Sequence, residues 1–220
     1  MQTYDIYNDI ALRTNGDIYV GVVGPVRTGK STFIKRFMEE IVLDRVENSN
    51  SRERAIDELP QSADGKTIMT TEPKFVPSEA IGIEVGDSSA KIRMIDCVGY
   101  LIPSALGGIE EGKPRMVKTP WNEETIPFEK AAEYGTEKVI KEHSTVGIVV
   151  TTDGSIGDIP REDYVLAEER VVKELKSIGK PFTIVVNCTN PESKETIDLS
   201  SNLNEKYGVS VIPLNLLTAG

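Results

Sequence analysis

The sequence predicts an α/β fold: an open, doubly wound and mostly parallel sheet with one antiparallel hairpin strand and helices on both faces. Three observations lead to this prediction. Continuous apolar runs such as "IYVGVV" and "TVGIVVT" are typical of buried parallel strands. Amphipathic stretches of helical length separate these runs, and alternating strands and helices favour a sheet that is covered on both faces. The segments "AIGIEV" and "KIRMID" flank "GDSS", which predicts the antiparallel hairpin.

The elements in the first half of the chain follow from apolar spacing and from breaker residues. The segment "YDIYNDIALRTNG" predicts a short amphipathic helix that ends near Gly16. The stretch 44–66 is too charged for a core and too long for a simple turn. The stretch 97–121 is rich in Gly and Pro and predicts a long irregular excursion. The remaining elements predicted here are a strand at 18–23, a helix at 30–43, and hairpin strands at 80–85 and 91–96.

The second half of the chain reads as three further helix and strand pairs. The clearest helix, 160–179, has Pro160 near its first turn and Gly179 past its end. The other elements are a helix at 127–143, strands at 145–151, 181–187 and 209–214, and a helix near 198–207. Within 160–179, the predicted apolar stripe comprises Val165, Val171, Val172, Leu175 and Ile178. The residues expected on the solvated face are Glu168, Arg170, Lys173 and Glu174.

Length and composition describe an ordinary soluble protein with one α/β core in 220 residues. The formal net charge is −10, and no dense Lys/Arg cluster is visible, so we expect no nucleic-acid partner. No apolar run approaches the roughly 20 residues of a membrane span. The start "MQTYDIYNDI" lacks the basic residues of a secretory signal, so a cytoplasmic location is expected. Cys97 and Cys188 each follow a predicted strand, and two intervening strands would hold them roughly 14 Å apart, beyond disulfide reach.

A phosphate-binding loop pattern occupies the turn after the first strand. In "GPVRTGKSTF" the spacing Gly24-x-x-x-x-Gly29-Lys30-Ser31 matches this pattern. Glycines let the backbone curl so that its N–H groups converge on phosphate oxygens, and the following helix points its positive end at them. Lys30 supplies a charge for the β- and γ-phosphates, and Ser31 supplies a hydroxyl for Mg²⁺. The predicted nucleotide-binding residues of this loop are Gly24, Arg27, Thr28, Gly29, Lys30, Ser31 and Thr32.

Two further segments complete a predicted site for Mg²⁺ and the γ-phosphate. Asp96 ends the strand "KIRMID", where a carboxylate can hold Mg²⁺ through water. In "DCVG", the N–H of Gly99 can meet a γ-phosphate without obstruction by a side chain. Thr70 and Thr71 lie between the first helix and the hairpin, where switch nucleotidases carry a threonine that completes the Mg²⁺ shell. The sequence does not distinguish between these two threonines.

Together these segments resemble the GTPase-like branch of P-loop nucleotidases, with a departure at the base. Relatives carry Asn-Lys-x-Asp after the corresponding strand, and this aspartate accepts two hydrogen bonds from guanine. Here the stretch is Asn187-Cys188-Thr189-Asn190, and an amide offers one donor and one acceptor, which suits adenine. We therefore expect Asn187 and Asn190 at the nucleotide, with ATP preferred over GTP. The alternative is that Asn190 is simply a turn residue before Pro191. Guanine selectivity is lost in that case too.

A second departure concerns catalysis. Tyr100 follows Gly99 at the place where Ras-like proteins hold a glutamine that orients water, so hydrolysis should be slow unless another group helps. Several relatives that lack this glutamine bind a monovalent cation through an Asn or Ser in the phosphate loop. Arg27 stands at that position here, and we hypothesise that its guanidinium acts as a built-in arginine finger. The alternative is that Arg27 points to solvent or pairs with an acidic residue of a neighbouring copy in a polymer.

Longer stretches resemble one family. The segments "GVVGPVRTGKSTFIKRFM", "DELPQSADGKTIMTTEPKFVP", "DCVGY", "PRMVKTPW" and "EHSTVGIVVTTDGSIGDI" are similar to stage IV sporulation protein A, a family of coat-morphogenesis ATPases in endospore-forming bacteria. The resemblance places the Walker-type lysine on Lys30, the metal-side aspartate on Asp96 and the sensor threonines on Thr70 and Thr71. It also implies that residues 1–220 form the N-terminal nucleotide-binding region of a longer protein, with ATP and Mg²⁺ as its cofactors.

For function, the resemblance implies ATP hydrolysis that serves assembly into a static homopolymer. This polymer would be the basement layer of the spore coat, on the mother-cell side of the forespore surface. Other coat proteins would bind through regions outside this chain. The competing hypotheses are a nucleotide-dependent switch that cycles with a partner and a scaffold that keeps nucleotide for folding only. Intact Lys30, Ser31 and Asp96 argue against the scaffold.

Overall fold

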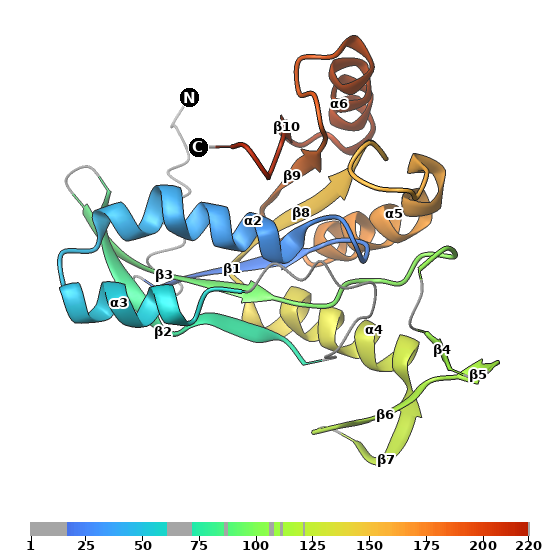
Figure 1. Ribbon diagram of the computed structural model, residues 1–220, viewed down its shortest axis with the longest axis horizontal. Coiled ribbons are helices and arrows are strands. Elements are labelled where there is room, and N and C mark those ends of the chain that lie inside the picture. The colour runs from blue at the N-terminus through green and yellow to red at the C-terminus, as the bar shows by residue number, and fades with distance from the viewer. Residues whose placement is uncertain are drawn as a thin grey trace.

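A six-stranded sheet forms the centre of the computed structural model, which describes residues 17–60, 72–85, 88–105, 108–110, 112–120 and 122–219 (Figure 1). The strand order is β10-β9-β8-β1-β3-β2, and every neighbouring pair is parallel except β2 and β3. The predicted doubly wound sheet with one antiparallel hairpin strand is therefore confirmed. The strands are β1 Asp17–Val23, β2 Lys74–Val85, β3 Ser88–Asp96, β8 Val146–Thr152, β9 Phe182–Asn187 and β10 Val211–Leu214.

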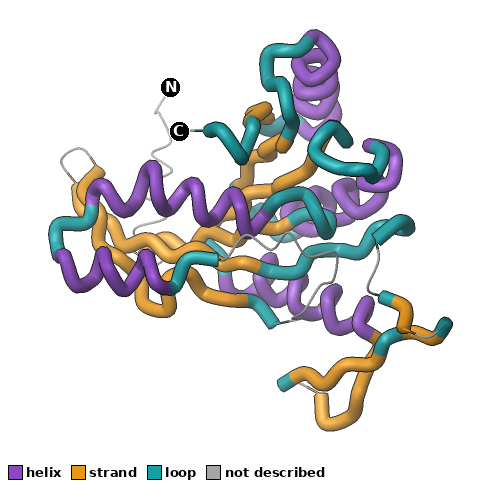
Figure 2. Tube along the Cα trace, viewed as in Figure 1, coloured by secondary structure: helices purple, strands orange, loops and turns teal. Residues whose placement is uncertain are grey.

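Helices cover both faces of this sheet (Figure 2). One apolar cluster joins the sheet to α2 and α3, and a second joins its opposite face to α5, α6 and the turn after α4. In β1, Val20 and Val22 belong to the first cluster and Val23 to the second. Because both faces are buried, the strand is continuously apolar rather than alternating. The helices are α2 Lys30–Phe37, α3 Ser49–Asp57, α4 Phe128–Lys138, α5 Arg161–Ser177 and α6 Lys194–Tyr207.

The helix predicted at 30–43 is confirmed in extent, but only its first part is α-helical. α2 continues as a π-helical turn at Met38–Val42 and a 3₁₀ turn at Leu43–Arg45. The polar stretch 44–66 contains a helix, α3, that was not predicted from the sequence. α3 begins after Asn48, whose side-chain oxygen accepts a hydrogen bond from the Ser51 amide at 3.0 Å, and it buries only Ala55. This local cap, rather than an apolar stripe, signals the helix.

Residues 97–121 were predicted to be irregular, and this prediction is wrong in part. The segment and its continuation form two small antiparallel ribbons, which project from the body of the molecule beside α4 (Figure 1). The four strands are β4 Ile109–Glu110, β5 Lys113–Pro114, β6 Met116–Thr119 and β7 Asn122–Pro127. Their shortness explains why no alternating pattern was visible in the sequence. The helix expected before Gly16 lies outside the described residues.

The second half of the chain follows the prediction closely. α4 runs into a π-helical turn at Val139–His143, which matches the helix expected at 127–143. α6 begins earlier than predicted because Ser193 caps it, accepting a hydrogen bond from the Thr196 amide at 3.2 Å. Cys97 and Cys188 are both buried and free, as expected. None of the helices in the described parts of the chain is long and apolar enough to cross a membrane.

Candidate nucleotide-binding site

The phosphate loop lies between β1 and α2, at the carboxyl edge of the parallel strands. Gly24 has a φ of 139° and Gly29 a φ of 93°. A Cβ atom would lie 2.2 Å from the Val150 carbonyl oxygen at Gly24, and 2.6 Å from Nδ2 of Asn187 at Gly29. Both positions therefore require glycine for conformation and for space. Arg27 also adopts a left-handed conformation, with a φ of 62°, so the loop holds a non-glycine residue in an unfavourable backbone region.

Lys30 begins α2 and is only 5% exposed. Its Nζ atom donates a hydrogen bond to the Pro25 carbonyl oxygen at 2.6 Å, so the amine lies within the curl of the loop. Burial lowers the pKa of Lys30 from its ordinary value, because removing the ammonium from water disfavours the charged form. An anion bound in the loop would favour the charged form of Lys30, so this position is electrostatically suited to a phosphate.

Ser31 and Asp96 meet where α2 begins and β3 ends. The Ser31 hydroxyl donates a hydrogen bond of 2.6 Å to Oδ2 of Asp96. Oδ1 of Asp96 is buried and makes no hydrogen bond with the described part of the chain. Burial raises the pKa of Asp96, and the Ser31 hydrogen bond and the Lys30 charge oppose this rise. An unpartnered buried carboxylate oxygen beside a hydroxyl fits Mg²⁺, which prefers oxygen ligands. Asp96 and Ser31 would hold the ion, and the bound ion would neutralise phosphate charge.

The segment after β3 lies directly against the phosphate loop. The Val26 amide donates to the Tyr100 carbonyl at 2.9 Å, and the Tyr100 amide donates to the Gly24 carbonyl at 3.3 Å. Gly99, which lies between Asp96 and Tyr100 in the chain, has a φ of 93°. A Cβ atom at Gly99 would lie 2.2 Å from the Gly24 carbonyl oxygen and 2.6 Å from the Lys30 amine. The structure thus brings Gly99 beside the lysine of the loop, and its predicted contact with a γ-phosphate stays a prediction.

Asn187 and Asn190 have different surroundings. The Asn187 amide nitrogen donates to the Thr28 carbonyl at 3.0 Å, and its oxygen accepts from the Leu216 amide at 3.3 Å. Asn187 therefore holds the backbone of the phosphate loop. Asn190 is exposed, and its side-chain oxygen accepts from the Glu192 amide at 3.2 Å, a contact that shapes a turn.

The remaining site predictions fall around this centre. Thr28 is fully buried, with its hydroxyl donating to the Pro25 carbonyl at 3.0 Å, whereas Thr32 is half-buried in the first turn of α2. Arg27 is also half-buried, and its charge acts on Tyr164 of α5, where it opposes the rise in the pKa of Tyr164 that burial causes. Thr70 and Thr71 lie outside the described residues.

A comparison with protein families decides the assignment. The family model described as "Stage IV sporulation protein A, ATPase domain" matches residues 1–219. The chain belongs to this family. It is 58% identical over 217 residues to the stage IV sporulation proteins A of Bacillus anthracis and Bacillus subtilis (strain 168), and these matches cover 98% of the chain. The protein of that name from Clostridioides difficile (strain 630) is 58% identical over 214 residues, or 97% of the chain.

The chain spans 44% of the length of each of these relatives. Among solved structures, the crystal structure of an SsGBP mutation variant matches 94% of this chain and 51% of its own, with 15% identity and a TM-score of 0.48, a likeness too distant to bear on function. The family assignment makes this chain an ATPase domain of a sporulation protein, which agrees with the family predicted from its motifs.

Glu168 was expected on the solvated face of α5, and this prediction is wrong. Its side chain is 0% exposed and lies where α5 packs against β8 and α6. Oε2 accepts hydrogen bonds of 2.6 Å from both the Thr151 hydroxyl and Nη2 of Arg161, and Oε1 accepts from the Tyr207 hydroxyl at 2.9 Å. Helical spacing carried the signal, since Glu168 lies one turn from buried Tyr164 on the same face of α5.

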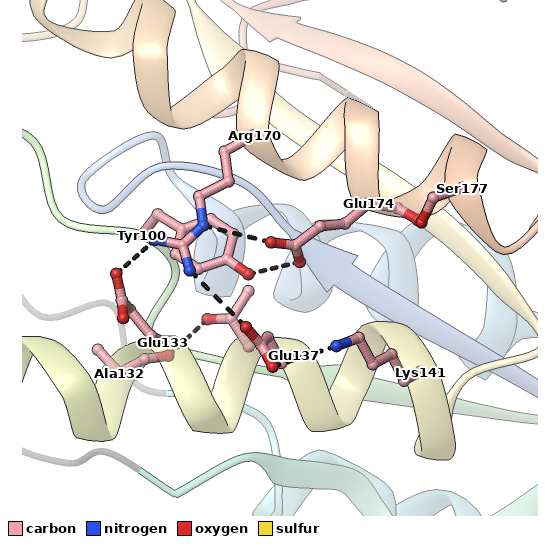
Figure 3. Close-up of polar contacts among 9 residues, drawn as sticks. Tyr100, Ala132, Glu133, Glu137, Lys141, Arg170, Glu174 and Ser177 are labelled. Atoms are coloured by element: carbon pink, nitrogen blue, oxygen red, sulfur yellow. Dashed lines mark hydrogen bonds and ion pairs between the residues drawn. The ribbon is translucent and has the colours of Figure 1, made fainter.

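Arg170 and Glu174, also expected on the solvated face, form a polar cluster around Tyr100 (Figure 3). Tyr100 is only 2% exposed, and its hydroxyl donates to Oε2 of Glu174 at 2.5 Å. The Arg170 guanidinium lies over the Tyr100 ring, 4.0 Å from its centroid. From the sequence, Tyr100 was expected only to stand in place of a catalytic glutamine. In the structure its side chain lies between α4 and α5 (Figure 3).

Proposed function

We propose that residues 1–220 form one nucleotide-binding domain that hydrolyses ATP with Mg²⁺, and that this turnover drives self-assembly of the protein. The product would be a static polymer that forms the basement layer of the spore coat. The family, whose matched domain is described as an ATPase domain, supports a sporulation role and ATPase chemistry. Assembly, its location on the mother-cell side of the forespore and binding of other coat proteins through regions outside this chain are parts of the proposal.

The Ser31–Asp96 pair beside Lys30 is the observation that carries the catalytic proposal. A hydroxyl, a buried carboxylate oxygen with no hydrogen-bond donor among the described residues, and a buried lysine amine converge at the end of β3 and the start of α2. In this site Lys30 would stabilise charge on the β- and γ-phosphates, and the Gly99 amide would contact the γ-phosphate. Thr70 and Thr71 are proposed to sense that phosphate.

Two further parts of the proposal concern recognition of the nucleotide base and stabilisation of the transition state. Asn190 would present an amide donor and acceptor to adenine, and the turn contact with Glu192 uses only its side-chain oxygen. Arg27 would offset the charge that develops between the β- and γ-phosphates, and its position three residues before Lys30 in the loop supports this role. These roles would give ATP preference without the guanine-reading carboxylate and hydrolysis without a catalytic glutamine.

The test measures ATP hydrolysis against protein concentration, together with sedimentation in the presence and absence of ATP, on the full-length protein. We expect hydrolysis and ATP-dependent pelleting in the parent, and loss of both in Lys30→Ala. Lys35→Ala is the matched control, because Lys35 lies on the same helix and forms a partly exposed ion pair with Glu39 at 3.9 Å. Parent-like hydrolysis in Lys30→Ala would remove the phosphate loop from the mechanism. A parent that hydrolyses ATP but stays soluble would favour the partner-cycling switch.

A further inference from the structure

Tyr100 connects the two backbone segments that line the phosphate site. Its amide and carbonyl pair with Gly24 and Val26 of the phosphate loop at 3.3 and 2.9 Å. Gly99 precedes it in the chain, so any movement of the Tyr100 backbone also moves the Gly99 amide. The position of Tyr100 therefore determines how Gly99 lies relative to the loop.

Arg170 is the centre of the contacts that hold the Tyr100 side chain (Figure 3). Its Nε atom lies 3.2 Å from Oε1 of Glu174, and the other oxygen of Glu174 accepts the Tyr100 hydroxyl. Its two terminal nitrogens face α4, where Nη1 is hydrogen-bonded to Glu133 and Nη2 lies 3.7 Å from Glu137. One guanidinium thus links α4, α5 and the aromatic ring that adjoins the phosphate site.

The chemistry of this arrangement depends on arginine. A planar guanidinium can stack on an aromatic ring while its edge donates hydrogen bonds to several carboxylates, whereas an ammonium cannot do both. The Arg170 side chain is 39% exposed, and a single ion pair at that exposure contributes little to stability. Here three carboxylates and one ring share the same cation, so its main effect is to fix their relative positions.

We propose that Arg170 is a positioning residue for the phosphate site: it holds Tyr100 against α5 and thereby fixes the Gly99 amide where the terminal phosphate of ATP binds. This inference rests on the proposed function. When Arg170 is removed, the Tyr100 ring loses its stacking partner and the Gly99 amide gains freedom of position. Because that amide is proposed to meet the terminal phosphate only, triphosphate binding and hydrolysis should suffer while diphosphate binding should not.

The experiment compares the full-length parent with Arg170→Ala and Arg170→Lys. Affinity is measured for ADP and for a non-hydrolysable ATP analogue, and kcat is measured for ATP, all well below the melting temperature of each variant. We expect Arg170→Ala to lower kcat on the order of tenfold to a hundredfold and to weaken the ATP analogue relative to ADP. Arg170→Lys should resemble Arg170→Ala, because lysine keeps the charge but not the planar fork.

Glu169→Gln is the matched control, since it breaks an exposed 2.5 Å ion pair between α5 and Lys206 without touching Tyr100. This variant should keep the parent's kcat and its preference for the ATP analogue over ADP. If Arg170→Ala lowers the melting temperature but keeps both parental values, Arg170 is merely structural and the inference is wrong. A parent that binds no ATP would overturn the proposed function as well, and this measurement is made first.

Discussion

Replacing Glu168 by alanine should destabilise the chain by about 3–5 kcal/mol, the usual cost of breaking a buried ion pair. The Glu168 carboxylate is 0% exposed, and it accepts hydrogen bonds from Arg161, Thr151 and Tyr207. The Arg161 side chain is only 16% exposed, so water could not fully hydrate its charge once the carboxylate is gone. Such a loss would be a large fraction of the free energy of unfolding of a typical domain, which is roughly 5–15 kcal/mol.

The individual contacts account for this magnitude. Each of the Thr151 and Tyr207 hydroxyls that loses its acceptor costs roughly 1–3 kcal/mol, and the Arg161 guanidinium without its partner carboxylate adds to this cost. Glu168→Gln keeps the shape and one acceptor but removes the charge, so its effect should be smaller, about 1–3 kcal/mol. The neighbouring Glu169 provides the control, because its ion pair with Lys206 has side chains that are 42% and 46% exposed. Glu169→Ala should cost at most about 1 kcal/mol.

Urea unfolding followed by far-UV circular dichroism measures these differences on the parent, Glu168→Ala, Glu168→Gln and Glu169→Ala. The midpoints should fall in the order parent, Glu169→Ala, Glu168→Gln and Glu168→Ala, with the last well separated from the others. Equal midpoints for the two alanine variants would mean that the Glu168 carboxylate is solvated, and the network described for it would be wrong.

Three other predictions concern Arg27 in the phosphate loop, Asn190 in the predicted base-binding segment and Cys188 at the end of β9. Arg27→Ala should lower ATP turnover by about 10³-fold or more while ATP affinity changes little, and Arg27→Asn should regain activity with potassium only; full activity of Arg27→Ala at low protein concentration would contradict this. Asn190→Asp should raise GTP affinity about tenfold in a competition assay, and unchanged affinity would leave Asn190 as a turn residue. Burial raises the pKa of Cys188 to about 11, and the residue is 0% exposed, so alkylation at pH 8 should be at least about 100-fold slower than in urea. Equal rates by peptide mass spectrometry would refute this prediction.

The arrangement of the candidate phosphate site could be predicted because its parts are local motifs. Gly24, Gly29 and Lys30 lie within one short loop, and Asp96 ends a strand whose apolar run is visible in the sequence. Parallel strands bring their carboxyl ends to one edge, so the loop and Asp96 had to meet. The hydrogen bond between Ser31 and Asp96 follows from that topology.

The polar clusters could not be predicted with the same ease, because their partners are far apart in the chain. Glu168 is buried by contacts to β8 and α6, and residue type alone favoured a solvated carboxylate. Arg170 and Tyr100 meet only because α5 packs across the segment after β3. Helix α3 was missed for another reason, since it lies on the surface and buries little.

The Mg²⁺ dependence of ATP hydrolysis in Asp96→Asn tests the central claim most directly. Asparagine preserves the size of the side chain but removes the charge from the buried oxygen that is proposed to hold the ion. Asp198→Asn, an exposed change on α6, is the control. We predict that the parent and Asp198→Asn show turnover stimulated by Mg²⁺, whereas Asp96→Asn still binds ATP but loses that turnover by about 10²-fold or more. Turnover and Mg²⁺ stimulation in Asp96→Asn equal to those of the parent would contradict the account.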